Sequence, residues 1–325
     1  IRGNLKRRAY LLYFIAKAKG IYRECARLLR KYDLTAFDGV TFYSFWLYDV
    51  ALAALWLSED CKNPVKKTIS RAHRYDLYPE AGSAHYLPLR RYLLEHLDAV
   101  YPCSQNGTDY LSEHYPPYAR KVHTAYLGTQ DFGMGPENKG DTVEIVSCCH
   151  IAPVKRVELL AQSLALLSEE KKKLHWTHFG GGDSLDDLKA YAAEHLQFMK
   201  TDFPGTVKNE DLLAYYRTHP VDWFVNTSSS EGLPVSIMEA CSFGIPIIAT
   251  DVGGTSELVR EDETGHLLKA DFTPEELAEL FRRLFRQKKE KHDALRQNCR
   301  RVWQEEFCAE VNFDRFAEEI RPQAE

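Results

Sequence analysis

The chain has 325 residues, of which 44% are hydrophobic and 27% are charged, and its formal net charge is −5. This length has room for two α/β domains, and no run of about twenty apolar residues predicts a membrane-spanning helix. No secretory signal is visible, and eight cysteines are scattered without a C-x-x-C pair. They indicate free thiols in a reducing, cytoplasmic compartment.

The first thirty-one residues are strongly basic, with Glu24 as their one acid. We expect a helix here, because Leu11, Leu12, Phe14 and Ile15 lie among the charges. Such a helix suits an anionic membrane surface, or its apolar face packs on a part of the domain absent from this sequence. Nucleic acid is not an expected partner, since no recognition module accompanies the helix. The basic residues are Arg2, Lys6, Arg7, Arg8, Lys17, Lys19, Arg23, Arg27, Arg30 and Lys31.

Residues 38–45 are predicted to form a strand, residues 46–58 a helix and residues 65–71 a second strand that leads to His73. A doubly wound domain normally begins with a strand and a glycine-rich loop, whereas this chain begins with a helix. The sequence therefore predicts an α/β domain over 1–132 that lacks its early strands. His73 is either a ligand contact at the strand end or a hydrogen-bonded structural residue.

Glycine, proline and polar residues gather over 133–140 and predict a linker. Strands and helices then alternate, which indicates a doubly wound parallel sheet within a second domain over 133–300. Ligands bind such sheets at the carboxyl ends of the strands, where His150, Glu231 and Asp251 fall. The expected strands are 143–149, 174–179, 223–226 and 245–249. A helical tail with Trp303, Phe307, Phe313 and Phe316 occupies 301–325.

The triple glycine at 180–182 follows one of these strands. A glycine cluster between a strand and a helix can bind the pyrophosphate of a dinucleotide, which would make the protein a dehydrogenase. The G-x-G-x-x-G spacing is not present, however, and a tight strand exit needs glycine for backbone reasons alone. We favour the backbone explanation.

The segment from Ser228 to Ala240 carries the strongest functional signal, because two carboxylates flank the predicted start of a helix. The backbone N–H groups of Gly232, Leu233 and Val235 would lie unpaired at the positive end of that helix, where a phosphate can bind. Glu231 would stand at the mouth of this pocket. Glu239 lies roughly on the same helix face as Val235. Amides that bind phosphate and carboxylates that bind hydroxyl groups together indicate a nucleotide sugar.

These residues resemble the donor-site signature of the family 4 retaining glycosyltransferases, which have the GT-B fold. The likeness covers Glu231 and Glu239, the Gly-Leu-Pro between them and the run 244–254. It extends to 147–160, where Lys155 matches one of the family's two basic residues and His150 replaces its usual arginine. Histidine is only partly protonated at neutral pH, so this change predicts weaker or pH-sensitive diphosphate binding. Residues 203–207 fit the family's loop near the nucleobase.

The resemblance implies two Rossmann-like domains with a cleft between them and a last helix that crosses back to the first domain. It implies transfer of a sugar from a UDP- or GDP-linked donor to a glycan or lipid-linked acceptor, with retention and without metal or cofactor. The histidines show no metal-ligand spacing either. The residue roles follow from the matched positions: Lys155 and His150 bind the diphosphate, Glu231 the sugar hydroxyls, Glu239 the ribose, Val207 the base through its main chain, and His73 the sugar from the first domain.

The family's commonest use suggests cell-surface polysaccharide biosynthesis. The protein would then be cytoplasmic, either free or peripheral on the inner face of the plasma membrane. The alternative is a degenerate GT-B protein that binds a nucleotide or a partner without turnover. His150 and the missing glycine loop favour that alternative, whereas Glu231 and Glu239 oppose it. Donor hydrolysis separates the two hypotheses.

Overall fold

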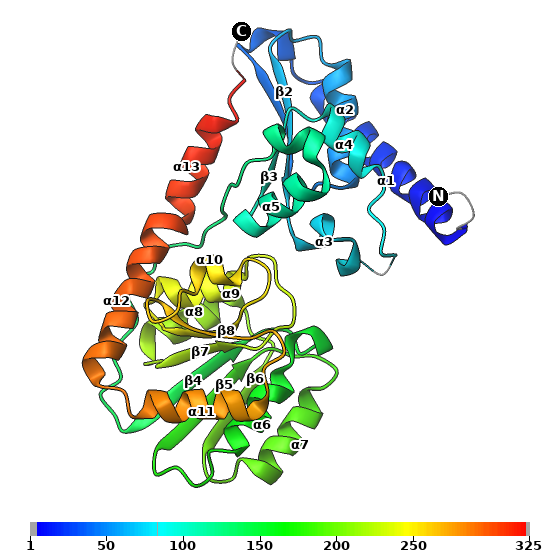
Figure 1. The fold of residues 1–325 in the computed structure, drawn as a ribbon. Coiled ribbons are helices and arrows are strands. Elements are labelled where there is room, and N and C mark those ends of the chain that lie inside the picture. The colour runs from blue at the N-terminus through cyan, green and yellow to red at the C-terminus, as the bar shows by residue number, and fades with distance from the viewer. Residues whose placement is uncertain (1–4, 83, 323–325) are drawn as a thin grey trace. The chain divides into compact units, whose positions relative to one another are not determined.

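The computed structural model describes residues 5–82 and 84–322. Its chain divides into two compact units. The first holds the described residues up to Leu127 together with those from Val311 onward, and the second is Gly128–Glu310. Each unit has its own parallel sheet (Figure 1). Arg2 of the predicted basic helix and residues 323–325 of the predicted tail lie outside the described residues.

The first unit contains a three-stranded sheet in the order β1-β2-β3. Its longest helix, α1 (Leu5–Leu29), packs along α2, where Phe14 meets Tyr48 edge to face and Lys17 pairs with Asp49 at 2.8 Å. Only Phe14 and Ala18 of α1 are buried, so most of this helix is exposed. The remaining elements are β1 (Val40–Ser44), α2 (Asp49–Asp60), β2 (Lys66–Ala72), α3 (Arg74–Leu77), α4 (Arg90–His96), β3 (Ala99–Pro102), α5 (Gln105–His114) and α13 (Ala309–Glu319).

The second unit contains a six-stranded, fully parallel sheet in the order β6-β5-β4-β7-β8-β9. A core of buried aliphatic and aromatic side chains, with Trp176 and Phe281 fully buried, packs the helices onto it. Its strands are β4 (Thr142–Cys148), β5 (Lys173–Phe179), β6 (Lys200–Gly205), β7 (Trp223–Asn226), β8 (Ile247–Thr250) and β9 (Gly265–Leu268). Its helices are α6 (Val157–Ala165), α7 (Leu185–His195), α8 (Asn209–Thr218), α9 (Val235–Ser242), α10 (Thr255–Leu258), α11 (Pro274–Phe285) and α12 (Lys289–Glu306).

The strand order defines a switch point between β4 and β7. From β4 the chain moves outward through β5 to β6, and it then returns to the far side of β4 to lay down β7, β8 and β9. The loops that follow β4 and β7 therefore leave the sheet in opposite directions and open a crevice at its carboxyl edge. The functional residues of an open α/β sheet are expected there.

The four strands predicted for this unit are confirmed as β4, β5, β7 and β8. β7 has its predicted bounds, and the other three differ by one or two residues at one or both ends. Two strands were not predicted. In β6 the residues Phe203 to Gly205, expected in a loop, are extended, and Pro204 is tolerated because β6 is the edge strand and needs no donor on its outer side. The other, β9, has only four residues and a weak apolar pattern.

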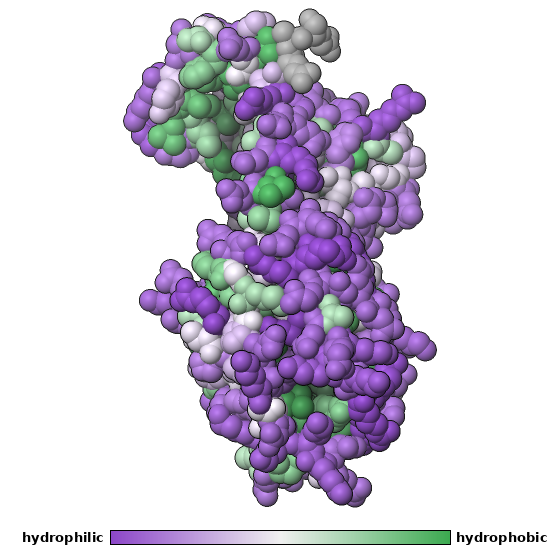
Figure 2. Space-filling view, turned by 90° about the vertical axis from the view of Figure 1, so that its left-hand side faces the viewer, coloured by the Kyte–Doolittle hydropathy of each residue, from purple (hydrophilic) through white to green (hydrophobic). Residues whose placement is uncertain are grey.

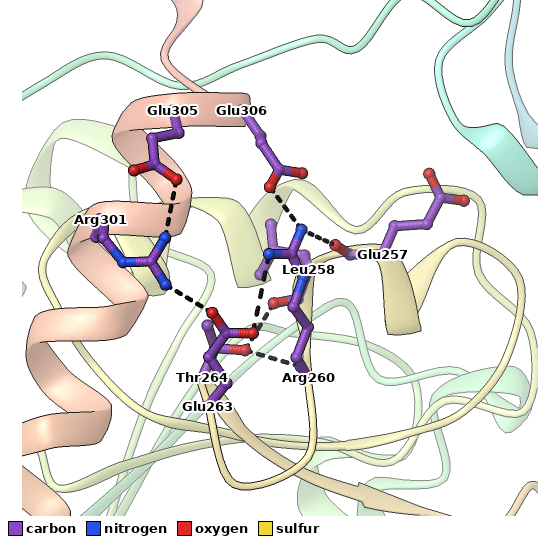
Figure 3. A network of polar contacts seen from close by, with 8 residues as sticks. All are labelled: Glu257, Leu258, Arg260, Glu263, Thr264, Arg301, Glu305 and Glu306. Carbon is purple, nitrogen blue, oxygen red and sulfur yellow. Dashed lines mark hydrogen bonds and ion pairs between the residues drawn. The ribbon is translucent and has the colours of Figure 1, made fainter.

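A network of ion pairs fastens the turn before β9 to α12 (Figure 3). Arg260 bonds Glu306 at 2.6 Å, and Arg301 bridges Glu263 at 2.6 Å and Glu305 at 2.9 Å. Thr264 closes the turn by donating its hydroxyl to the Leu258 carbonyl at 2.7 Å. These contacts fix the approach to β9 and leave the opposite, carboxyl edge of the sheet free of them.

The surface is hydrophilic over most of the face in Figure 2, with apolar side chains in separate patches. On α1, Leu5, Leu12 and Tyr13 are among the most exposed apolar residues of the described chain. None of the helices within 5–82 and 84–322 combines the length and apolarity that crossing a membrane requires.

Candidate active site

Lys155 and Glu231 meet at the switch point of the second sheet. Lys155 follows β4 and Glu231 follows β7, and the Lys155 Nζ lies 2.6 Å from Glu231 Oε1. The lysine side chain is 26% exposed and the carboxylate 9%, so the pair is largely shielded yet open to solvent on the lysine side. A buried carboxylate of this kind needs a partner, and the lysine supplies it.

Hydrogen bonds between the two loops hold this pair in place. Thr227 donates its hydroxyl to the carbonyl groups of Lys155 and Arg156, at 2.9 and 3.0 Å. Arg156 returns a bond from Nε to the Thr227 carbonyl at 2.8 Å, and Ser229 N donates to Val154 O at 2.8 Å. The backbone of Arg156 is left-handed, with a φ of 49°, which turns the loop into α6.

A third loop, after β8, supports the Glu231 backbone. Gly254 N donates to Gly232 O at 2.7 Å, and a Cβ atom at Gly253 would lie only 2.1 Å from Glu231 O. Because Gly253 also has a φ of +58°, only glycine fits this approach. Asn226, the last residue of β7, reaches Glu231 Oε1 at 3.4 Å through its side-chain amide. Loops from three neighbouring strands thus converge on one carboxylate.

The start of α9 offers backbone donors beside this carboxylate. The helix begins at Val235, which confirms the predicted helix start, and Pro234, expected in the first turn, is its N-cap. In the part of the chain that the structure describes, the N–H groups of Gly232, Leu233 and Val235 have no hydrogen-bond acceptor. Together with Lys155 they form a donor-rich crevice that suits a phosphate group.

Glu239 lies one helical turn further along α9 and is buried to 9% exposure. Its Oε1 accepts a 2.8 Å hydrogen bond from the Asn209 side-chain amide, at the start of α8. Burial raises the pKa of Glu239, and the bond from Asn209 opposes this shift. Val207 precedes α8 by two residues, and its backbone groups have no partner among the described residues. The Asn209 bond therefore ties the loop of Val207 to the face of Glu239.

His150 and the three glycines lie beside the same crevice. His150 is exposed in the loop after β4. Ile151 N donates to Gly181 O at 2.7 Å, and Cβ atoms at Gly180 and Gly182 would fall 1.8 and 2.3 Å from backbone oxygens of the loop at 149–151. This close approach explains the glycines without a dinucleotide.

His73 follows β2 in the first unit. Its ring lies 4.4 Å from that of Phe45 and 4.6 Å from that of Trp46, measured between centroids. Burial, with a smaller contribution from Arg71, lowers the pKa of His73 to about 4, and neither ring nitrogen has a hydrogen-bond partner among the described residues. His73 is therefore neutral at physiological pH and suited to hydrogen bonding rather than to charge pairing.

Among the described residues, one group has the spacing of metal ligands: Glu261, Asp262 and His266. It lies at the start of β9, at the amino edge of the sheet, whereas Glu231 lies at the carboxyl edge. His266 Nδ1 already bonds Glu261 at 2.8 Å, and Arg283 lies 3.8 Å from the same carboxylate. The predicted absence of a catalytic metal stays a prediction.

Sequence reasoning missed Asn209, Asn226 and Arg156. Asn226 carries a signal in retrospect, since a polar residue closes an apolar strand immediately before the glutamate motif. Asn209 lies thirty residues from Glu239, and only the tertiary structure brings them together. The left-handed backbone of Arg156 has no sequence signal, because arginine rarely adopts it.

The comparisons with known proteins agree with this geometry. A model of the family described as glycosyl transferases group 1 matches residues 134–302. The O-antigen biosynthesis glycosyltransferase WbnH of Escherichia coli is 36% identical over 130 residues, which cover 36% of this chain and 34% of that protein. The match thus spans about a third of the relative's length.

Two solved structures show the fold. Sucrose-phosphate synthase from Thermosynechococcus elongatus aligns with a TM-score of 0.74 and 19% identity, over 94% of this chain and 78% of that one. Anabaena Alr3699/HepE in complex with UDP-glucose aligns with a TM-score of 0.69 and 16% identity, over 92% and 81%. These likenesses confirm the predicted α/β fold of the GT-B class.

Proposed function

Because the chain belongs to the glycosyl transferases group 1 family, we propose that it transfers a sugar from a nucleoside diphosphate donor to a glycan or lipid-linked acceptor. The observation that carries this proposal is the Lys155–Glu231 pair, 2.6 Å apart at the switch point and bordered by the free amides of α9. One cation and several N–H groups suit a diphosphate, and the carboxylate suits sugar hydroxyls.

Donor binding exchanges the partners of this pair. The diphosphate takes Lys155 and the amides of Gly232, Leu233 and Val235, while Glu231 turns to the hydroxyl groups of the sugar. Because each charged group gains a new partner as it loses the old one, no buried charge is left unpaired. The pair therefore keeps the two side chains ordered for the donor, and less conformational entropy is lost on binding.

The remaining proposed contacts are those of the matched motif positions. Glu239 accepts hydrogen bonds from the ribose hydroxyls, held in place by Asn209. Val207 offers its backbone to the base. His150 approaches the diphosphate from the loop after β4. The role of His73 toward the transferred sugar stays a prediction from its matched motif position.

The proposed chemistry is retaining and independent of metal. As the bond from the sugar to the phosphate breaks, the sugar becomes cationic and the leaving diphosphate gains charge. Lys155 and the amides at the start of α9 stabilise that charge, in place of a metal ion. The acceptor attacks the face from which the diphosphate departs, and the leaving phosphate takes its proton.

We also propose a role in cell-surface polysaccharide biosynthesis at the cytoplasmic face of a membrane. WbnH of Escherichia coli is named for O-antigen biosynthesis, and HepE was solved with UDP-glucose. The exposed residues of α1 include Arg8, Lys19 and Arg23 besides Leu5 and Leu12. Such a surface binds anionic lipids, where a lipid-linked acceptor would be found.

Calorimetric titration with UDP, GDP and NAD, without metal and with magnesium, tests this function. We expect selective binding of UDP or GDP that does not need magnesium, and slow hydrolysis of the corresponding nucleotide sugar. Binding without hydrolysis would support the degenerate, non-catalytic alternative. Preference for NAD, or binding of none by folded protein, would overturn the proposal.

A further inference from the structure

Three buried side chains form a row of hydrogen bonds that links β4 and β5 next to the donor crevice. Ser147, Trp176 and His178 are at most 3% exposed. Ser147 and His178 are paired in the register of the two parallel strands, so their side chains lie on the same face. Trp176 Nε1 lies 2.9 Å from Ser147 Oγ, and Ser147 Oγ lies 2.8 Å from His178 Nδ1. The contacts of the proposed donor site do not use these residues.

The direction of the hydrogen bonds in this row is fixed by its first member. An indole N–H can only donate, so Ser147 Oγ accepts from Trp176. The serine hydroxyl must then give its own proton to an acceptor, and His178 Nδ1 is the one it contacts. With Nδ1 accepting, a neutral His178 carries its proton on Nε2. The opposite tautomer would leave the serine hydroxyl proton unpaired in the core.

The Nε2 side of His178 faces the loop after β4. A Cβ atom at Gly180 would lie 1.8 Å from Cys149 O and 3.2 Å from His178 Nε2, so both atoms border the same small space, which glycine leaves open. Nε2 is buried and has no hydrogen-bond partner within the described residues. Burial lowers the pKa of His178 to about 4, and the Cys149 backbone opposes this shift, as a carbonyl facing an N–H does.

We propose that His178 is a positioning residue for the donor diphosphate: as a neutral ring with its proton on Nε2, it directs this N–H to the Cys149 carbonyl and so orients the loop that carries His150 and Lys155. The inference rests on the proposed function of this crevice. The N–H of Cys149 belongs to the preceding peptide, which joins Cys148 to Cys149, and it donates to Phe179 O at 3.0 Å. A bond from His178 to the Cys149 carbonyl orients the next peptide plane, which joins Cys149 to His150 and begins the loop.

Two measurements on the full chain test this inference. The first is the tautomer of His178 in ¹⁵N-histidine-labelled protein, assigned by the signal that disappears in His178→Phe, or that shifts in Ser147→Ala if the phenylalanine variant does not fold. We expect a proton on Nε2, a bare Nδ1 and no titration between pH 5 and 8. A proton on Nδ1, or a charged ring at neutral pH, would overturn the inference whatever the protein binds.

The second measurement compares the affinity for UDP or GDP, whichever binds, with the affinity for the matching nucleoside. His178→Phe keeps a ring of similar volume. It should lower the affinity for the diphosphate about fivefold, the value of one hydrogen bond, and leave the affinity for the nucleoside unchanged. His175→Gln, at the far end of β5, is the matched control and should alter neither affinity. Equal losses for both ligands would make His178 a packing residue. Failure of the wild-type protein to bind either diphosphate would instead overturn the proposed function and leave the tautomer result standing.

Discussion

At the scale of single residues, the charged groups of the crevice already have hydrogen-bonding partners within the protein. Lys155 neutralises Glu231 across 2.6 Å, and Asn209 holds Glu239 at 2.8 Å. Both carboxylates are buried to 9% exposure, where an unpaired charge would be costly. These contacts orient the side chains before a donor arrives, which lowers the entropic cost of binding.

Replacement of Glu239 by alanine tests the ribose contact. Because a hydrogen bond to a charged group contributes about 1.5–3 kcal/mol, Glu239→Ala should lower the affinity for UDP or GDP at least about tenfold. Titration calorimetry measures the effect, and Glu210→Ala, an exposed glutamate in the first turn of α8, is the control. An affinity unchanged in Glu239→Ala would remove this residue from the site.

Sequence reasoning reached some of these residues and not others. Lys155, Glu231 and Glu239 stand in short motifs whose spacing relative to a strand end and a helix start is visible in the chain itself. Asn209 could not be found from the sequence, because only the tertiary structure brings it to Glu239, thirty residues away. The roles of His150, Val207 and His73 stay predictions, since each depends on where a donor binds.

At the scale of secondary-structure elements, the glycines after β5 allow two loops to touch. Gly182 has a φ of +151°, and its Cβ would lie 2.3 Å from Ile151 O. Gly182→Ala should therefore destabilise the protein by at least about 2 kcal/mol and weaken diphosphate binding, because the loop of Lys155 is displaced.

Denaturant unfolding and calorimetry measure the two effects. Gly20→Ala is the control: this glycine lies within α1 with nothing within 4 Å of an added Cβ, and alanine there should stabilise by up to about 1 kcal/mol. A destabilisation in Gly182→Ala no larger than that of an ordinary surface substitution would contradict the close approach.

His175 joins three strands in a pH-dependent way. Its Nδ1 lies 2.7 Å from Glu144 of β4 and its Nε2 2.8 Å from Asp202 of β6. The bond to Glu144, against the opposing effect of burial, raises the pKa of His175. Its contribution to stability is thus fully present below the unfolded pKa of about 6.5 and is lost as the pH rises through the higher folded value.

The difference in unfolding free energy between the wild type and His175→Gln should therefore decrease as the pH rises. It should be largest, about 1–2 kcal/mol, near pH 6 and should become small toward pH 9. Urea unfolding at a series of pH values measures it. A difference that grows with pH would show that His175 is not charged in the folded protein.

The elements also show what a periodic pattern can and cannot predict. Short apolar segments bounded by turn residues identified β4, β5, β7 and β8, because central strands of a parallel sheet are covered on both faces and so are rich in apolar residues. The two edge strands were not predicted, because β6 contains Pro204 and β9 is only four residues long beside a polar turn. Tertiary pairing, rather than local preference, makes these two segments extended.

At the scale of the whole molecule, the charge is divided unequally along the chain. The net charge is −5, yet α1 exposes several cations on a helix of which only Phe14 and Ala18 are buried. Lys19→Glu with Arg23→Glu should reduce sedimentation with phosphatidylglycerol-containing vesicles at least about tenfold, since each basic residue near such a surface contributes about 1 kcal/mol. Neither the wild type nor this double variant should sediment with neutral vesicles.

The matched control reverses two exposed cations of the second unit, Arg286→Glu with Lys291→Glu, and thereby produces the same net charge. If both double variants lose vesicle binding equally, net charge rather than α1 governs the interaction. If neither does, the proposed contact of α1 with an anionic membrane is wrong.

The most direct measurement of the central claim is the affinity of wild-type and Lys155→Ala protein for UDP or GDP, whichever binds, and for the matching nucleoside. If the diphosphate lies at the Lys155–Glu231 pair, the variant should lose at least about tenfold in affinity for the nucleotide and almost none for the nucleoside. Equal losses for both ligands, or no loss for either, would contradict this account of the site.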